Sequence, residues 1–301
     1  MALVAFDLDN TLGFFEHINP WADFFSVDTL ENRFNRIINP DFKLSASLQK
    51  TLRIAERVFV ENLLNNRELL ETVLRPNLSA FIIPLIKAKA KGTVRAVCIY
   101  SNTWNTFSVH VGKALIEAVY DAPGLFDAVV DASHPIREID WKNKKQGSQI
   151  KSFENLTLIF KKLCKVRGTI RPSDILFIDE RMTKHEIKRE EVRGLVYLKP
   201  TEYFPRLSEA LRYQAFQLGM SVIDECRLFK NMEYLDSDIF NCLKYGAFEN
   251  GNTYIPITNI ADLIEMTEHI IRGSGKNWKT FKDDSREVTK VICEFLIKVK
   301  N

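Results

Sequence analysis

The stretch LVAFDLDNTL, residues 3–12, decides the fold of this chain. Its first four residues are apolar without polar alternation, which is typical of a parallel strand that is covered on both faces. Asp7 and Asp9 follow directly, two residues apart. Ligands of open α/β sheets bind beyond the carboxyl ends of the strands, so both carboxylates are expected to enter one cleft there. One can attack an electrophile while the other donates a proton to the leaving oxygen, and a divalent cation would relieve their mutual repulsion.

Other apolar runs predict further strands of the same parallel sheet. The expected strands cover residues 3–6, 95–100, 126–130, 174–178 and 194–198. Between them, apolar residues recur at three- and four-residue steps over 77–90 and 151–166, a period that is typical of amphipathic helices. Strand–helix alternation with right-handed connections predicts an α/β layer fold.

Two regions interrupt this alternation. Residues 14–75 are rich in Leu, Phe, Arg and Glu and predict a helical insertion, a cap placed after the first strand. Residues 201–301 are expected to be mostly helical, with a turn at 249–252 that would close a small hairpin. The expected domains are therefore a core, a helical cap and a C-terminal extension, at residues 1–13 with 76–200, 14–75, and 201–301.

Composition places the chain among soluble globular proteins. Of its 301 residues, 46% are hydrophobic and 27% charged, which excludes a disordered chain. The net charge of +3 is too small to indicate a nucleic-acid or membrane partner. Five cysteines without a CxxC pair are expected to be buried and reduced, and no apolar run has the length of a membrane span or a signal peptide. We therefore expect a cytoplasmic protein, and the oligomeric state stays open.

The run from Asp7 to Leu12 resembles the DxDx[TV][LV] first motif of the haloacid dehalogenase (HAD) superfamily of phosphohydrolases. The second motif of that superfamily is an apolar strand that ends in Ser or Thr. Residues 97–102 are similar to it, with Ser101 at the strand end and Asn102 after it. A hydroxyl and neighbouring backbone N–H groups at that position can hold a phosphate oxygen.

The two remaining motifs also have counterparts. Residues 175–180 resemble the fourth motif, a strand that ends in acids, here Asp179 and Glu180. Many members carry a second aspartate at that place, so the longer Glu180 leaves open which acid makes the second metal contact. The third motif is a lysine before the helix that precedes the last motif. Lys151 occupies that place, and three other lysines of the same loop are alternatives: Lys142, Lys144 and Lys145.

The resemblance implies a Rossmann-like core and a Mg²⁺-dependent phosphomonoester phosphatase that works through an aspartyl-phosphate. In that reaction Asp7 would be the nucleophile and Asp9 the general acid and base. The phosphate of the substrate would be bound by Thr11, Ser101, Asn102 and Lys151. The metal would be held by Asp7, Asp179, Glu180 and the backbone carbonyl of Asp9. Mg²⁺ suits such a site because it prefers oxygen ligands.

The substrate class depends on the insertion, which is similar to a C1-type cap. A cap over the cleft favours a small phosphorylated metabolite or a nucleotide. An open cap would instead admit a phosphoprotein or a nucleic-acid end. A protein that kept the fold and binds ligands with weak catalysis is the alternative from another class, and residues 201–301 as a separate interaction module is a further one.

Overall fold

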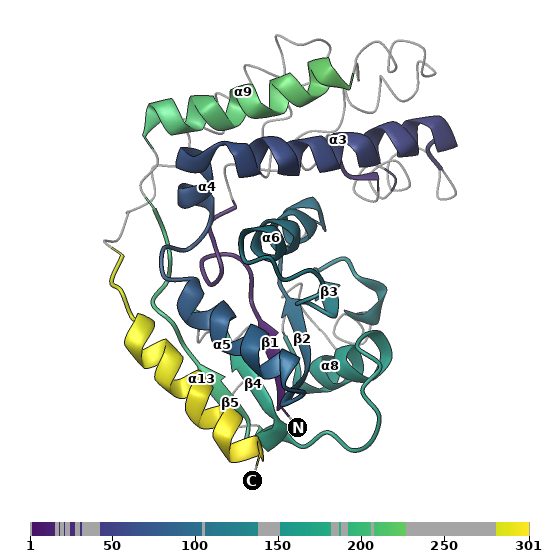
Figure 1. Cartoon of the computed structure of the whole chain (residues 1–301). Coiled ribbons are helices and arrows are strands. Elements are labelled where there is room, and N and C mark those ends of the chain that lie inside the picture. The colour runs from purple at the N-terminus through teal and green to yellow at the C-terminus, as the bar shows by residue number, and fades with distance from the viewer. Residues whose placement is uncertain are drawn as a thin grey trace, which may run out of the picture. The chain divides into compact units, whose positions relative to one another are not determined.

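A computed structural model gives the structure of the chain. It describes residues 2–15, 18, 21, 25–27, 31, 43–103, 106–137, 151–181, 187, 192–205, 208–226 and 281–300. The chain forms two compact units (Figure 1). The sheet unit comprises Met1–Phe15, Leu70–Arg206 and Lys279–Asn301, and the helical unit comprises Glu16–Leu69 and Leu207–Trp278.

A five-stranded parallel sheet forms the centre of the sheet unit. Its strands are β1 (Ala2–Phe6), β2 (Val94–Tyr100), β3 (Ala128–Val130), β4 (Ile175–Ile178) and β5 (Val196–Leu198). They lie in the order β3-β2-β1-β4-β5, with every neighbouring pair parallel. The chain therefore moves from β1 to one side and then returns to build the other, so the strand order reverses beside β1. The structure confirms the expected α/β fold and all five predicted strands.

Helices cover both faces of the sheet, which is why its strands are apolar throughout. The longer described helices of this unit are α5 (Ser79–Ala90), α6 (Thr106–Val119), α8 (Phe153–Leu158) with a π-helical turn (Ile159–Leu163), and α13 (Ser285–Lys300). Leu3 and Ala5 of β1 belong to a buried cluster with α8 and the π-helical turn. Phe6 points to the other face, where its ring lies 6.3 Å from that of Phe81 in α5. Helix α13 packs against α5 on that face.

The helical unit has a long helix, α3 (Ala46–Asn65), against which α9 (Glu209–Glu225) packs. Trp21 contacts α9, because its indole nitrogen donates a hydrogen bond of 3.1 Å to the carbonyl of Ala215. Gly219 lies against the same indole, where an added Cβ would be 1.9 Å from a ring atom. Helix α4 (Arg67–Val73) leads the chain back into the sheet unit. No described helix has the length and apolar character that a bilayer crossing requires.

The division of the chain differs from the expected boundaries at residues 14–75 and 201–301. The last hundred residues belong to both units: α9 lies with the insertion, whereas α13 lies with the sheet. The reason is the apolar face of each helix, since α9 buries its face against α3 and α13 buries Val288, Ile292 and Phe295 within the sheet unit. The turn predicted at 249–252 lies outside the described residues.

Candidate active site

The register of the sheet brings the predicted acids to one edge. Phe6 of β1 pairs with Ile178 of β4, so Asp7 and Asp179 leave adjacent strands side by side. The backbone N–H of Asp7 donates a hydrogen bond of 2.8 Å to the carbonyl of Ile178, which continues the ladder by one step. Ser101 ends the neighbouring strand β2 on the other side of β1.

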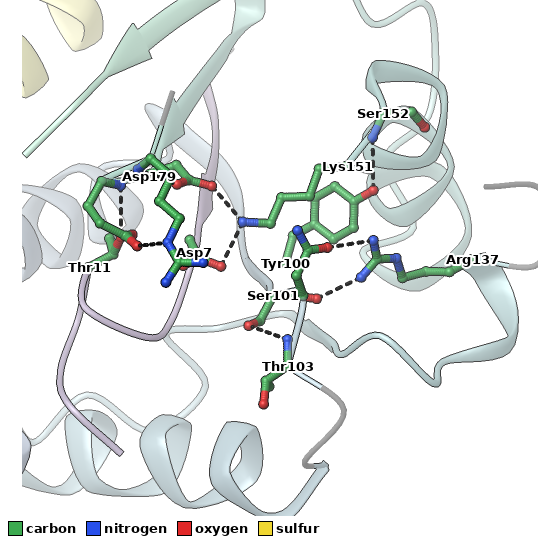
Figure 2. Close-up of polar contacts among 12 residues, drawn as sticks. Asp7, Thr11, Tyr100, Ser101, Thr103, Arg137, Lys151, Ser152 and Asp179 are labelled. Atoms are coloured by element: carbon green, nitrogen blue, oxygen red, sulfur yellow. Dashed lines mark hydrogen bonds and ion pairs between the residues drawn. The ribbon is translucent and has the colours of Figure 1, made fainter. Parts of the chain in front are cut away.

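Three carboxylates converge at this edge. Asp7, Asp179 and Glu180 are buried, and each offers an oxygen that lies within 4.8 Å of the other two. Lys151 joins two of them: its ammonium donates hydrogen bonds of 2.7 Å to Asp7 Oδ1 and 2.5 Å to Asp179 Oδ2 (Figure 2). Its side chain is 1% exposed. The structure thus brings Lys151 together with Asp7 and Asp179, while Lys142, Lys144 and Lys145 lie outside the described residues.

The N-terminus of α8 directs Lys151 into the cluster. Ser152 caps this helix, since its hydroxyl accepts a hydrogen bond of 3.1 Å from the backbone N–H of Asn155. The backbone N–H of Ser152 donates in turn to the hydroxyl of Tyr100, at 3.1 Å (Figure 2). The ammonium of Lys151 also lies 5.6 Å from the centre of the Phe177 ring. The backbone next to Lys151 and the ammonium at the end of its side chain are therefore both held in place.

The turn after β1 shapes the rest of the first motif. Asn10 has a φ of 62°, a left-handed conformation that Asn tolerates better than most residues, and its N–H donates to the carbonyl of Gly13. This turn buries Thr11, whose hydroxyl donates to the Glu180 carboxylate and accepts from the Glu180 N–H. Thr11 therefore orients Glu180 here, and its expected contact with phosphate stays a prediction. Asp9 is half-buried and is outside the converging group of carboxylates.

Ser101 and Asn102 are held by Arg137, a residue that the sequence does not indicate. Arg137 donates hydrogen bonds of 2.7 Å to the carbonyl of Ser101 and 2.8 Å to Asn102 Oδ1. Its guanidinium also lies 5.0 Å from the centre of the Tyr100 ring. The Ser101 hydroxyl accepts from the N–H of Thr103, at 3.2 Å. No sequence signal marks Arg137, because a single arginine in a loop has no periodicity and its two acceptors lie 36 and 35 positions away in the sequence.

Burial makes negative charge costly in this cluster. Burial raises the pKa of Asp7 and the neighbouring Asp179 adds to the rise, while Lys151 opposes both. The pKa of Glu180 is raised to about 9, by burial first and then by Asp7 and Asp179. Three carboxylates that share one lysine are a donor set that fits a hard divalent cation, which would supply the missing positive charge.

Comparisons with known proteins add one likeness. No family model and no curated protein matches the chain. Among solved structures, it is similar to a HAD-superfamily hydrolase, subfamily IA, variant 1, from Geobacter sulfurreducens. The two are 14% identical with a TM-score of 0.31, over 66% of this chain and 89% of that one. A TM-score this low supports neither fold nor function, so both rest on the sheet and the side chains described above.

Proposed function

We propose that this protein is a Mg²⁺-dependent phosphomonoester phosphatase of the HAD type, with an aspartyl-phosphate intermediate on Asp7. The observation that carries the proposal is the position of Asp7. It is buried at the carboxyl end of the central strand, with Lys151 at 2.7 Å and two further acids beside it. A carboxylate in such a place is oriented as a nucleophile, and the lysine offsets the charge of an incoming phosphoryl group.

In this proposal Asp7 supplies the attacking electron pair and Asp9 transfers the protons. An oxygen of Asp7 attacks phosphorus, the bond from phosphorus to the leaving oxygen breaks, and Asp9 donates its proton to that oxygen. Asp9 then accepts a proton from the water that attacks the phosphorus of the intermediate, which releases inorganic phosphate and restores Asp7. Lys151, Ser101 and the amide of Asn102 bind the phosphoryl oxygens.

Mg²⁺ would be held by Asp7, Asp179 and Glu180, with the backbone carbonyl of Asp9 as a further ligand. When bound, it supplies neutralisation of the charge on the phosphoryl oxygens. Thr11 contributes by orienting Glu180 through both of its hydrogen bonds. Glu180 thus fills the place of a second aspartate in the proposed metal site.

We propose a small phosphorylated metabolite or a nucleotide as the substrate class. The support is the insertion of the helical unit, which begins at Glu16, directly after the turn that carries the acids. In the HAD superfamily, an insertion at this point of the chain acts as a cap that limits the size of the substrate. A phosphoprotein or a nucleic-acid end is the alternative that an open cap would admit.

The test is hydrolysis of p-nitrophenyl phosphate and of a panel of sugar phosphates and nucleotides, with and without Mg²⁺. We compare the wild type, Asp7→Asn, and Asp131→Asn, which alters a buried acid after β3 that is outside the cluster. The proposal predicts Mg²⁺-dependent turnover that disappears in Asp7→Asn and persists in Asp131→Asn. Turnover that survives in Asp7→Asn contradicts the mechanism. No turnover of any compound by the wild type contradicts the phosphatase and favours a binding protein.

A further inference from the structure

Arg137 is a buried cation that the proposed mechanism does not use. It ends a short 3₁₀ turn, Pro135–Arg137, in the loop after β3, and only 1% of it is exposed. Burying a guanidinium is costly unless its hydrogen bonds are satisfied, so a buried arginine beside a candidate active site calls for a physical reason. The polar groups that it contacts provide one.

We propose that Arg137 is a positioning residue that fixes the phosphate-binding groups of the site through Ser101, Asn102 and Tyr100. This inference rests on the proposed function, because Ser101, Asn102 and Lys151 are the groups proposed to hold the phosphoryl oxygens. Arg137 itself is assigned no contact with the substrate. Figure 2 shows it on the far side of Tyr100 and Ser101 from the carboxylates.

Arg137 holds the loop that follows β2. Arg137 binds this loop with two nitrogens of one planar group, at 2.7 Å to the Ser101 carbonyl and 2.8 Å to Asn102 Oδ1. The N–H of Ser101 is held from the other side by the carbonyl of Val130, at 2.9 Å. Both peptide groups of Ser101 are therefore anchored, which holds its backbone in place. The bond to Oδ1 also turns the amide NH₂ of Asn102 away from Arg137.

Arg137 is also linked to Lys151, through Tyr100 and Ser152. The guanidinium of Arg137 lies 5.0 Å from the centre of the Tyr100 ring, and Tyr100 is fully buried. The hydroxyl of Tyr100 accepts a hydrogen bond from the N–H of Ser152, the residue that follows Lys151. Arg137 and Tyr100 therefore form a continuous frame from the end of β2 to the start of α8. Through this frame, one side chain sets the positions of two phosphate-binding elements that lie about fifty residues apart in the sequence.

The frame requires arginine rather than any cation. Lysine keeps the charge but offers a point donor, so it cannot bind both acceptors in one plane while stacking on Tyr100. Arg137→Lys is therefore the variant that separates positioning from charge. We expect it to lower kcat/KM for p-nitrophenyl phosphate by about 10²-fold, the loss that a displacement of about 1 Å can cause. The inhibition constant of inorganic phosphate, which binds to the same groups, should rise in parallel.

The experiment measures kcat, KM, the phosphate inhibition constant and the melting temperature for a set of variants. Arg137→Lys removes the planar fork, and Tyr100→Phe removes the hydrogen bond from the N–H of Ser152. Asn102→Ala removes an acceptor of Arg137 and, with it, a proposed phosphate ligand, so it serves only in the double variant with Arg137→Lys. Arg171→Lys is the matched control, because its side chain is 72% exposed and pairs with Asp174 away from the site. If Arg137→Lys does not fold, Tyr100→Phe still tests the frame, because Tyr100 is not among the proposed phosphate ligands.

The inference predicts that Arg137→Lys and Tyr100→Phe weaken phosphate inhibition and raise KM, that the double variant Arg137→Lys/Asn102→Ala is less than additive, and that the control is unchanged. A fall in melting temperature with unchanged KM and phosphate inhibition in Arg137→Lys and Tyr100→Phe would show a merely structural role and overturn it. In that case Mg²⁺- and Asp7-dependent turnover still supports the proposed function. If the wild type has no such turnover, the proposed function fails and the inference fails with it.

Discussion

A buried ion pair links Arg75, which lies between α4 and α5, to Asp284, which directly precedes α13. The loss of stability on breaking this pair can be predicted from its burial. The guanidinium of Arg75 is 0% exposed, and its Nη2 lies 2.9 Å from Oδ1 of Asp284, whose side chain is 11% exposed. Asp284 also accepts hydrogen bonds from the N–H of Thr201, at 2.5 Å, and from the amide of Asn77, at 2.6 Å. Nη1 of Arg75 donates to the carbonyls of Thr201 and Thr11, and Nε donates to Asn77 Oδ1.

Asp284→Ala leaves Arg75 buried without its carboxylate. Breaking a buried ion pair from one side costs about 3–5 kcal/mol. Because Asp284 keeps slight contact with solvent, we expect the lower end, about 3 kcal/mol of the free energy of unfolding. For a unit of this size, each kcal/mol lowers the melting temperature by about 2–4 °C. The expected loss is therefore about 6–12 °C.

The assay is thermal unfolding followed by circular dichroism, with Asp283→Asn as the matched control. Asp283 is the exposed neighbour of Asp284, and Asn at that position can still accept the hydrogen bond from the N–H of Ser285. The control should unfold close to the wild-type temperature. Equal melting temperatures for Asp284→Ala and Asp283→Asn would refute the reasoning, because they would mean that Arg75 finds its compensation elsewhere.

Three further predictions concern Asp284, Lys151 and Gly219. Burial favours the neutral form of Asp284, but the Thr201 N–H, Arg75 and Asn77 outweigh it and hold the pKa of Asp284 below its ordinary value of 3.8. The ionised form of Asp284 therefore stabilises the fold above about pH 4, and this contribution is lost as the pH falls through the lowered pKa. The melting temperature of Asp284→Asn should therefore fall less steeply below about pH 4 than that of the wild type. Lys151→Met removes the cation between Asp7 and Asp179 and should lower phosphatase activity by about 10²–10³-fold. The same change at exposed Lys162 is the control and should leave the activity unchanged. Equal activities of the two variants would contradict the proposed role of Lys151. Gly219→Ala places a Cβ 1.9 Å from the Trp21 ring, and this overpacking should lower the free energy of unfolding by about 1–3 kcal/mol. Urea unfolding measures the change, with the exposed substitution Gln217→Ala as the control. Equal free energies of unfolding for the two variants would contradict the packing of Gly219 against Trp21.

The sheet and the acidic cluster could be predicted from the sequence because each leaves a local pattern. A strand that is covered on both faces is a short apolar run, and residues 3–6 and 175–178 show this clearly. An acid directly after such a run must lie at the edge of the sheet, so Asp7 and Asp179 could be placed together without any knowledge of the loops. Lys151 is indicated by its position before a helix, whereas its contacts with Asp7 and Asp179 leave no pattern in the sequence.

The remaining contacts join residues that are far apart in the sequence or involve backbone atoms. Arg137 and Ser101 are 36 positions apart, and the acceptor is a carbonyl that every residue has. Arg75 and Asp284 are 209 positions apart, so nothing local indicates that they pair. Helices α9 and α13 both have an apolar face, and the sequence does not tell which partner each face meets. For this reason the expected C-terminal extension proved to be divided between the two units.

The most direct test of the central claim is to trap the phosphoryl group on Asp7. Asp9→Asn should still transfer phosphate from p-nitrophenyl phosphate, because nitrophenolate leaves without a proton, but it lacks the base that activates water for the second step. We predict that acid-quenched Asp9→Asn, incubated with Mg²⁺ and this substrate, gains the mass of one phosphoryl group on the peptide that contains Asp7, and that hydroxylamine removes it. The double variant Asp7→Asn/Asp9→Asn should gain none. Phosphoryl label on another peptide, or label that persists in the double variant, would contradict the account.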